Sequence, residues 1–191
     1  MITVDGDSIF RDTDESPSMY SIGWGLSGTA RFAGQTRIWY PVLAHMICAY
    51  RMSSQAAGAL ALLHDAAESI VGDQVTTWKN DLTKQDEDML LERILDRLGL
   101  VVTELEWEEV RRVDAALLAA EALLLGHSDP DHPHFKIVRE ELPELYQIAL
   151  EHTSSMIGKI SPVTTSRQKY ANLFVSLVDK AVSESNQVVV A

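Results

Sequence analysis

The pair His64-Asp65 stands inside an apolar run and is followed by Glu68. Burying a carboxylate without a partner is costly, so these groups need a counter-ion, and a metal ion is an efficient one. The composition predicts a helix over 55–71 that ends at Gly72, with the pair in its middle. On such a helix Glu68 follows His64 by four residues, so both side chains lie on the same side.

Two more polar residues interrupt apolar stretches: His45, in a helix expected over 41–52, and Asp114, in a helix expected over about 106–126. Taken singly, each is more simply a satisfied polar group of the core. The order His, His-Asp, Asp on three helices instead predicts nitrogen and oxygen ligands for a divalent transition metal or Mg²⁺. Glu121, two turns beyond Asp114 on the same stripe, is a candidate for orienting a ligand or holding a second ion.

Apolar residues recur at helical spacing in three further segments, 83–98, 135–157 and 166–184. The first forty residues are rich in Gly, Ser, Thr and Asp and predict loops and short turns. The valines at 188–190 are the one strand-like stretch. We therefore expect an all-α protein with one domain over 1–191, its core over about 28–184 and a loop-rich segment over 1–40.

The composition and net charge argue against some classes of function. The chain has 191 residues and a net charge of -12, with 46% hydrophobic and 23% charged residues, which is typical of a globular protein. The acidity argues against binding long nucleic acids, although a small anionic substrate remains open because a metal can neutralise it. Cys48 is the only cysteine, so a reducing compartment is expected. Without a signal-like start or a membrane-length apolar run, we expect a cytoplasmic protein, in the host cytoplasm if it is viral, that does not bind membranes.

The order His45, His64-Asp65, Asp114 resembles the pattern of the HD-domain metal-dependent phosphohydrolases. The chain is most similar to the small bacterial and phage members that act on deoxynucleotides, the 5′-nucleotidases and the dATP triphosphohydrolases. The resemblance covers residues 28–125, and its most specific pieces are Arg31-Phe32-Ala-Gly-Gln-Thr, Tyr40-Pro-Val-Leu-Ala-His45, Leu63-His64-Asp65-Ala-Ala-Glu68-Ser-Ile-Val-Gly72-Asp73 and Val113-Asp114. It implies an HD-type helical bundle that forms homo-oligomers.

The resemblance also implies a role for each matching residue. The metal ligands, for Co, Mn, Zn or Mg, are His45, His64, Asp65 and Asp114. Glu68 positions or deprotonates the attacking water, and Asp73 accepts a hydrogen bond from the deoxyribose 3′-hydroxyl. Arg31 and Lys79 hold phosphate, and Phe32 borders the nucleotide.

The expected activity is hydrolysis of a small 2′-deoxynucleotide by metal-activated water. A triphosphohydrolase acting on dNTPs, with dATP favoured by the resemblance, is the first expectation, and a deoxynucleoside 5′-monophosphatase is the alternative. A non-catalytic helical binding module that keeps the metal is the alternative from another class. A second possible metal cluster around His127, His132 and His134 is more simply a proline-bearing surface loop.

Overall fold

The computed structural model of the chain describes residues 2–9, 14–74, 80–126, 132–160 and 167–190. Within these ranges the protein is all-helical, with two isolated β-bridges and no strand, which confirms the predicted class. The elements are α1 (Met19–Gly28), the 3₁₀ turn η1 (Arg31–Gly34), α2 (Val42–Met52), α3 (Gly58–Leu63), α4 (Glu68–Val71), α5 (Asp81–Arg97), α6 (Glu104–Leu124), α7 (Pro133–Glu141), α8 (Pro143–Met156) and α9 (Arg167–Val190).

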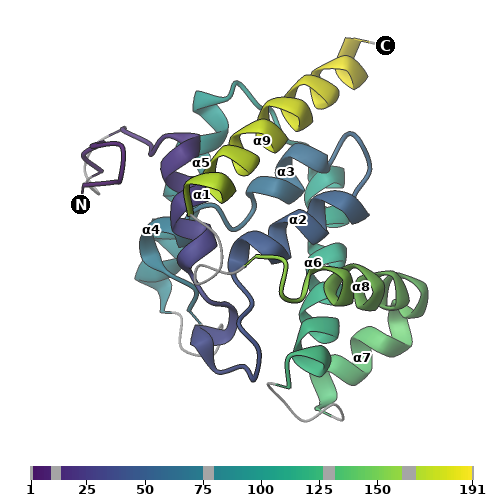
Figure 1. The fold of residues 1–191 in the computed structure, drawn as a ribbon. Coiled ribbons are helices and arrows are strands. Elements are labelled where there is room, and N and C mark those ends of the chain that lie inside the picture. The colour runs from purple at the N-terminus through teal and green to yellow at the C-terminus, as the bar shows by residue number, and fades with distance from the viewer. Residues whose placement is uncertain (1, 10–13, 75–79, 127–131, 161–166, 191) are drawn as a thin grey trace.

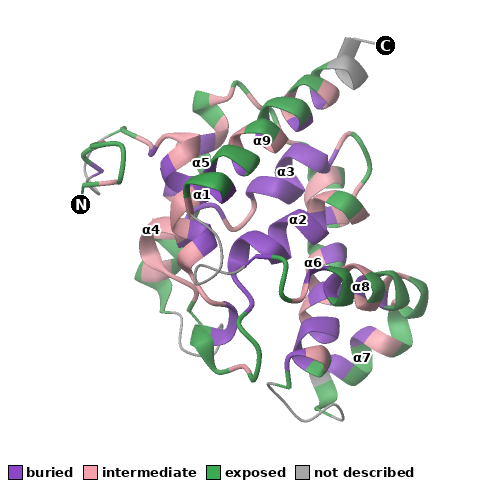
Figure 2. Cartoon of the chain, in the orientation of Figure 1, coloured by how far each residue is buried: buried purple, intermediate pink, exposed green. Residues whose placement is uncertain are grey.

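Helix α2 lies at the centre of the molecule and packs against α1, α3, α6 and α8 (Figure 1). Every residue from Val42 to Ala49 is buried, including His45. In Figure 2 both α2 and α3 are drawn almost entirely in the buried colour. The helix that carries the first candidate ligand is therefore a core helix.

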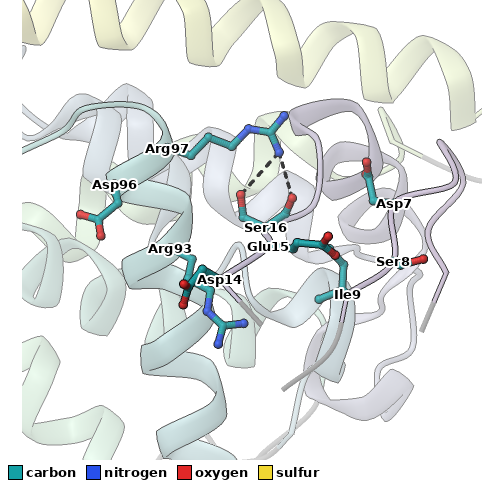
Figure 3. Close-up of a pocket in the computed structure, with 9 residues that line it drawn as sticks. All are labelled: Asp7, Ser8, Ile9, Asp14, Glu15, Ser16, Arg93, Asp96 and Arg97. Atoms are coloured by element: carbon teal, nitrogen blue, oxygen red, sulfur yellow. Dashed lines mark hydrogen bonds between the residues drawn. The ribbon is translucent and has the colours of Figure 1, made fainter. Parts of the chain in front are cut away.

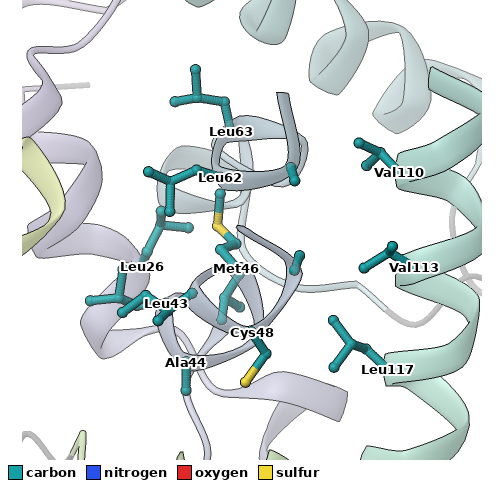
Figure 4. Packing of buried hydrophobic residues seen from close by; sticks show 14 of the residues in the cluster. Leu26, Leu43, Ala44, Met46, Cys48, Leu62, Leu63, Val110, Val113 and Leu117 are labelled. Carbon is teal, nitrogen blue, oxygen red and sulfur yellow. The ribbon is translucent and has the colours of Figure 1, made fainter. Parts of the chain in front are cut away.

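The apolar stripe of α6 faces this central helix. Figure 4 shows Val110, Val113 and Leu117 projecting from α6 toward α2, where Met46 and Leu43 lie. A capping box begins α6: the Thr103 side chain accepts from the Glu106 amide, and the Glu106 carboxylate accepts from the Thr103 amide. The capping box sets where the helix begins, and packing of the apolar stripe leaves the neighbouring Asp114 at the edge of the core.

The prediction of loops throughout residues 1–40 is wrong for 19–28, which form α1. Ser18 caps this helix by accepting a hydrogen bond from the Ser21 amide at 3.0 Å. The glycines that indicated turns instead allow close packing against α9, because a Cβ on Gly23 would lie 2.7 Å from the Cβ of Phe174. Tertiary packing here outweighs the low helix propensity of glycine.

Two other predicted segments differ at their ends. Residues 135–157 form two helices rather than one, because Pro143 has no amide hydrogen to continue α7 and begins α8 instead. The valines at 188–190, read as strand-like, complete α9. An isolated apolar triplet gains no strand partner among the described residues, and helix propagation from α9 decides its conformation.

The helix predicted over 55–71 is interrupted at the candidate site. Helix α3 ends at Leu63 and α4 begins at Glu68. Between them the amide of Ala66 bonds the Leu63 carbonyl and the amide of Glu68 bonds the Asp65 carbonyl, so each bond spans three residues. This tighter turn, and not a continuous α-helix, presents His64 and Asp65.

Candidate metal centre

Three elements bring the predicted ligands together. His45 comes from α2, His64 and Asp65 from the turn after α3, and Asp114 from α6. One ligand atom from each of His45, His64 and Asp114 lies within 4.8 Å of the others, and this group can hold a metal ion. Three of the four predicted ligands thus converge from positions that are far apart in the sequence, and Asp65 is not part of this group.

His45 is fully buried and its tautomer is set by Glu121. Nδ1 of His45 lies 2.9 Å from Oε1 of Glu121, which is also fully buried. A carboxylate can only accept here, so Nδ1 carries the hydrogen and Nε2 is turned toward Asp114. A carboxylate behind a histidine orients the ring and raises its basicity as a ligand. Glu121 therefore orients the His45 ring, which is one of the two possibilities that its spacing left open.

His64 is oriented in the same way by the backbone. Its Nδ1 lies 2.8 Å from the carbonyl oxygen of Ala61, three residues earlier in the chain. Because a carbonyl has no hydrogen to give, Nδ1 is the donor and Nε2 is left for another partner. The interruption after Leu63 and this hydrogen bond together aim Nε2 of His64 at the centre.

The two Nε2 atoms face each other at 3.3 Å. Asp114 Oδ1 lies 3.2 Å from Nε2 of His45 and 4.0 Å from Nε2 of His64. Lone pairs and a negative charge that converge in this way repel one another unless a cation or a proton lies between them. The donor set, imidazole nitrogen with carboxylate oxygen, suits a divalent transition metal.

When no metal is bound, a proton on the His45 imidazole supplies the positive charge between these groups. Burial and the Arg31 cation lower the pKa of His45, but Glu121 and Asp114 outweigh them and raise it to about 10. Removal from bulk water raises the pKa of Asp114, whereas the hydrogen bond and charge of His45 hold it well below its usual range. Asp114 therefore stays ionised and ready to act as a ligand.

Asp65 lies beside the same centre. Its Oδ2 is 3.4 Å from Nε2 of His64 and 3.7 Å from Nε2 of His45. The same oxygen is 3.6 Å from Nη1 of Arg31. Asp65 thus lies between the two histidines and the arginine, with one oxygen near all three side chains.

Arg31, the predicted phosphate contact, is buried next to the centre. Its Nε donates to Oε2 of Glu121 at 3.2 Å. Burial lowers the pKa of Arg31, but the surrounding carboxylates of Glu121, Asp65, Glu68 and Asp73 raise it above its usual range. The guanidinium is therefore a fixed positive charge at the edge of an acidic centre.

Phe32, predicted to border the nucleotide, is buried and packs against Arg31. Its ring is buried and lies 5.5 Å from the Arg31 guanidinium carbon. Phe32 and Ala33 both hold left-handed backbone, with φ of 56° and 51°. This tight left-handed turn in η1 directs the arginine inward, which the sequence pattern alone does not indicate.

The other predicted site residues lie after the turn. Glu68 begins α4 and is buried. Asp73 follows Gly72, which ends α4 with a φ of 82°, a backbone conformation that favours glycine. Both carboxylates act on the charge of Arg31, so they belong to the same neighbourhood. Lys79 lies outside the described residues, as does His127 of the possible second cluster.

A cavity of about 210 Å³ opens from the candidate ligands between α5 and α6. It is lined by His64, Asp65, Asp114, Glu87, Asp88, Leu91, Trp107, Val110 and Arg111. Trp107 and Arg111 precede Asp114 by seven and three residues, which places all three on one side of α6. This spacing relative to Asp114 is the sequence feature that indicates Trp107 and Arg111, although neither was among the predicted site residues.

A larger hollow lies elsewhere in the described part of the chain. It has about 650 Å³ and is formed where the N-terminal segment meets the end of α5 (Figure 3). Arg97 donates there to the carbonyl and hydroxyl oxygens of Ser16. None of the described residues that line it belongs to the candidate metal centre.

Comparison of the chain with known family models and with curated protein sequences gives no match. In the described ranges no helix combines the length and the apolar character needed to cross a bilayer.

Proposed function

We propose that the chain is an HD-type metal-dependent phosphohydrolase that acts on small 2′-deoxynucleotides. The observation that carries this proposal is the convergence of the His45 and His64 Nε2 atoms on Asp114, with Nδ1 of each histidine held by an acceptor. The four ligands of the proposal are His45, His64, Asp65 and Asp114. The HD-type bundle, the single domain, the homo-oligomer and the cytoplasmic location belong to the same proposal.

A divalent cation at this centre would neutralise charge on phosphoryl oxygens and make a water molecule more nucleophilic. Arg31 supplies a fixed positive charge for a second phosphoryl oxygen, and Glu121 and Asp65 keep its guanidinium in place. Buried Glu68 orients the attacking water and takes its proton. Asp73 receives the 3′-hydroxyl of the sugar, and Lys79 adds a phosphate contact.

The first candidate substrate is a dNTP, with dATP favoured, cleaved to release triphosphate. A specific observation favours the 5′-monophosphatase as the second candidate. Among the described residues lining the cavity beside the ligands, Arg111 is the only lysine or arginine, whereas four are carboxylates: Asp65, Glu87, Asp88 and Asp114. A polyphosphate chain entering this cavity would meet mainly like charge.

One assay tests the proposal and separates the two substrates. The protein is incubated with each dNTP and each dNMP together with Co²⁺, Mn²⁺, Zn²⁺ or Mg²⁺, and the released triphosphate or phosphate is identified. We expect turnover that requires the metal. Failure to turn over any nucleotide with any of these metals would refute the hydrolase.

Substitution of Glu68 separates catalysis from a metal-containing binding module. Glu68→Gln and Glu68→Ala should lower kcat by about 10²–10⁴-fold, the usual contribution of a general base, while metal content stays unchanged. A binding module predicts ligand binding without turnover in the unsubstituted protein. Glu108→Gln, on the exposed surface of α6, is the control and should leave kcat unchanged.

A further inference from the structure

Next to the cavity beside the ligands lies a second hollow of about 430 Å³ between α5 and the segment before α6. Asp88, Leu91 and Trp107 line both spaces, so the two hollows adjoin, and the first of them begins at the ligands. We call the two together the α5–α6 trough. Its size is in the range of about 300–1,000 Å³ that is usual for small-molecule sites.

The charges of the trough argue against a phosphate chain in it. Glu92 and Asp96 border its second part, and no described lysine or arginine lines that part. Arg111, in the first part, is paired with Glu104. Because these carboxylates and a phosphate carry like charge, the trough is unsuited to the anionic end of a nucleotide.

The remaining chemistry of the trough suits a heterocyclic base. Trp107 is half-buried and shares the wall with Leu91 and with the apolar side chains of Leu95, Leu100 and Val102. An indole offers a flat surface on which any base can stack. Carboxylates such as that of Asp88 accept hydrogen bonds from amino groups on a base and repel ring carbonyl oxygens.

We propose that the α5–α6 trough binds the base of the nucleotide, with Trp107 as the stacking surface and Asp88 selecting bases that bear an amino group. This inference rests on the proposed function, since it assumes that the phosphate lies at the metal centre. It assigns base selectivity to two residues on α5 and α6 that the sequence pattern did not single out.

The matched ligands dCMP and dUMP test the amino-group preference, because they differ by an amino group and a ring carbonyl. Calorimetric titrations use the metal-loaded Glu68→Gln protein, which should keep the metal without hydrolysing the ligand, and should give tighter binding of dCMP. Asp88→Asn, at an exposed position of α5, should reduce the dCMP-to-dUMP ratio of affinities by about three- to tenfold, the usual net effect of one hydrogen bond that is exposed to water. Glu108→Gln is the control and should keep the ratio.

Deoxyribose 5-phosphate, which has no base, tests the stacking role. Trp107→Ala should weaken dAMP binding by about tenfold or more while changing the binding of deoxyribose 5-phosphate less than about twofold, and Trp107→Phe should restore dAMP binding in large part. Equal losses for both ligands, or an unchanged dCMP-to-dUMP ratio in Asp88→Asn, would overturn the assignment of the trough. If these ligand preferences hold but the unsubstituted protein turns over no nucleotide, the trough assignment stands and the hydrolase is refuted, so the two failures are distinguishable.

Discussion

Glu121 and His45 form a hydrogen-bonded pair at 2.9 Å in which both side chains are fully buried. They lie 76 residues apart in the sequence, on α6 and α2. The other carboxylate oxygen of Glu121 accepts from Arg31. One buried acid therefore orients a candidate metal ligand and anchors the cation proposed to bind phosphate, which makes it the central support of the site.

Glu121→Gln should weaken metal binding by about 10–100-fold, the usual effect of losing a carboxylate behind a ligating histidine. The amide can still occupy the space, but it no longer balances Arg31 or favours the Nδ1 hydrogen of His45. Metal content after dialysis against a weak chelator measures the effect. Glu108→Gln is the matched control on the same helix, and equal metal retention in the two variants would contradict the role of Glu121.

Metal binding should strengthen as the pH rises. Burial and Arg31 lower the pKa of His45, and Glu121 and Asp114 outweigh them to raise it to about 10. A metal must displace that proton from Nε2, so the logarithm of the binding constant should rise by about one per pH unit below pH 10. Titration of Mn²⁺ between about pH 6.5 and 8.5 measures this slope, and a pH-independent affinity would contradict it.

The stability of the metal-free protein should change with pH in the opposite direction. The pKa of His45 is higher in the folded chain than its ordinary value of 6.5, so folding favours the protonated ring. This stabilisation is complete below about pH 6.5 and is lost as the pH rises through about 10. Chemical unfolding of chelator-treated protein over this range measures the loss. His45→Gln should flatten the dependence.

Ala33→Gly should stabilise the protein. Ala33 is exposed and has a φ of 51°, a left-handed conformation that costs an alanine about 1–2 kcal/mol, while glycine loses about 0.5–1 kcal/mol more chain entropy on folding. The net gain is about 0.5–1 kcal/mol in the free energy of unfolding. Ala115→Gly, inside α6, is the control and should cost about 1 kcal/mol. A loss of stability in Ala33→Gly would show that this backbone is not strained.

Gly23→Ala should destabilise the protein by about 1–3 kcal/mol, as overpacking of a core usually does. The new Cβ would lie 2.7 Å from the Cβ of Phe174 and 3.1 Å from the Cα of Ala171, so α1 and α9 must separate. Thermal and chemical unfolding measure the change. Gln147→Ala, on the exposed face of α8, should alter stability by less than about 0.5 kcal/mol.

The sequence alone determined the features that depend on neighbouring residues. The capping signal of Thr103 and Glu106 and the apolar stripe after it specify α6, because both act within a few residues. The candidate ligands were also readable, since polar residues within apolar runs stand out in any conformation. His45, His64 and Asp114 are the group that the structure brings together.

Only the tertiary structure decided how these residues meet. A continuous helix through His64 has good local propensity, but the chain turns after Leu63 and His64 donates to Ala61. The pairing of His45 with Glu121 and the trough beside Trp107 likewise depend on α2, α5 and α6 packing together. Such contacts join residues distant in the chain, and their energies come from burial and charge, which no local pattern carries.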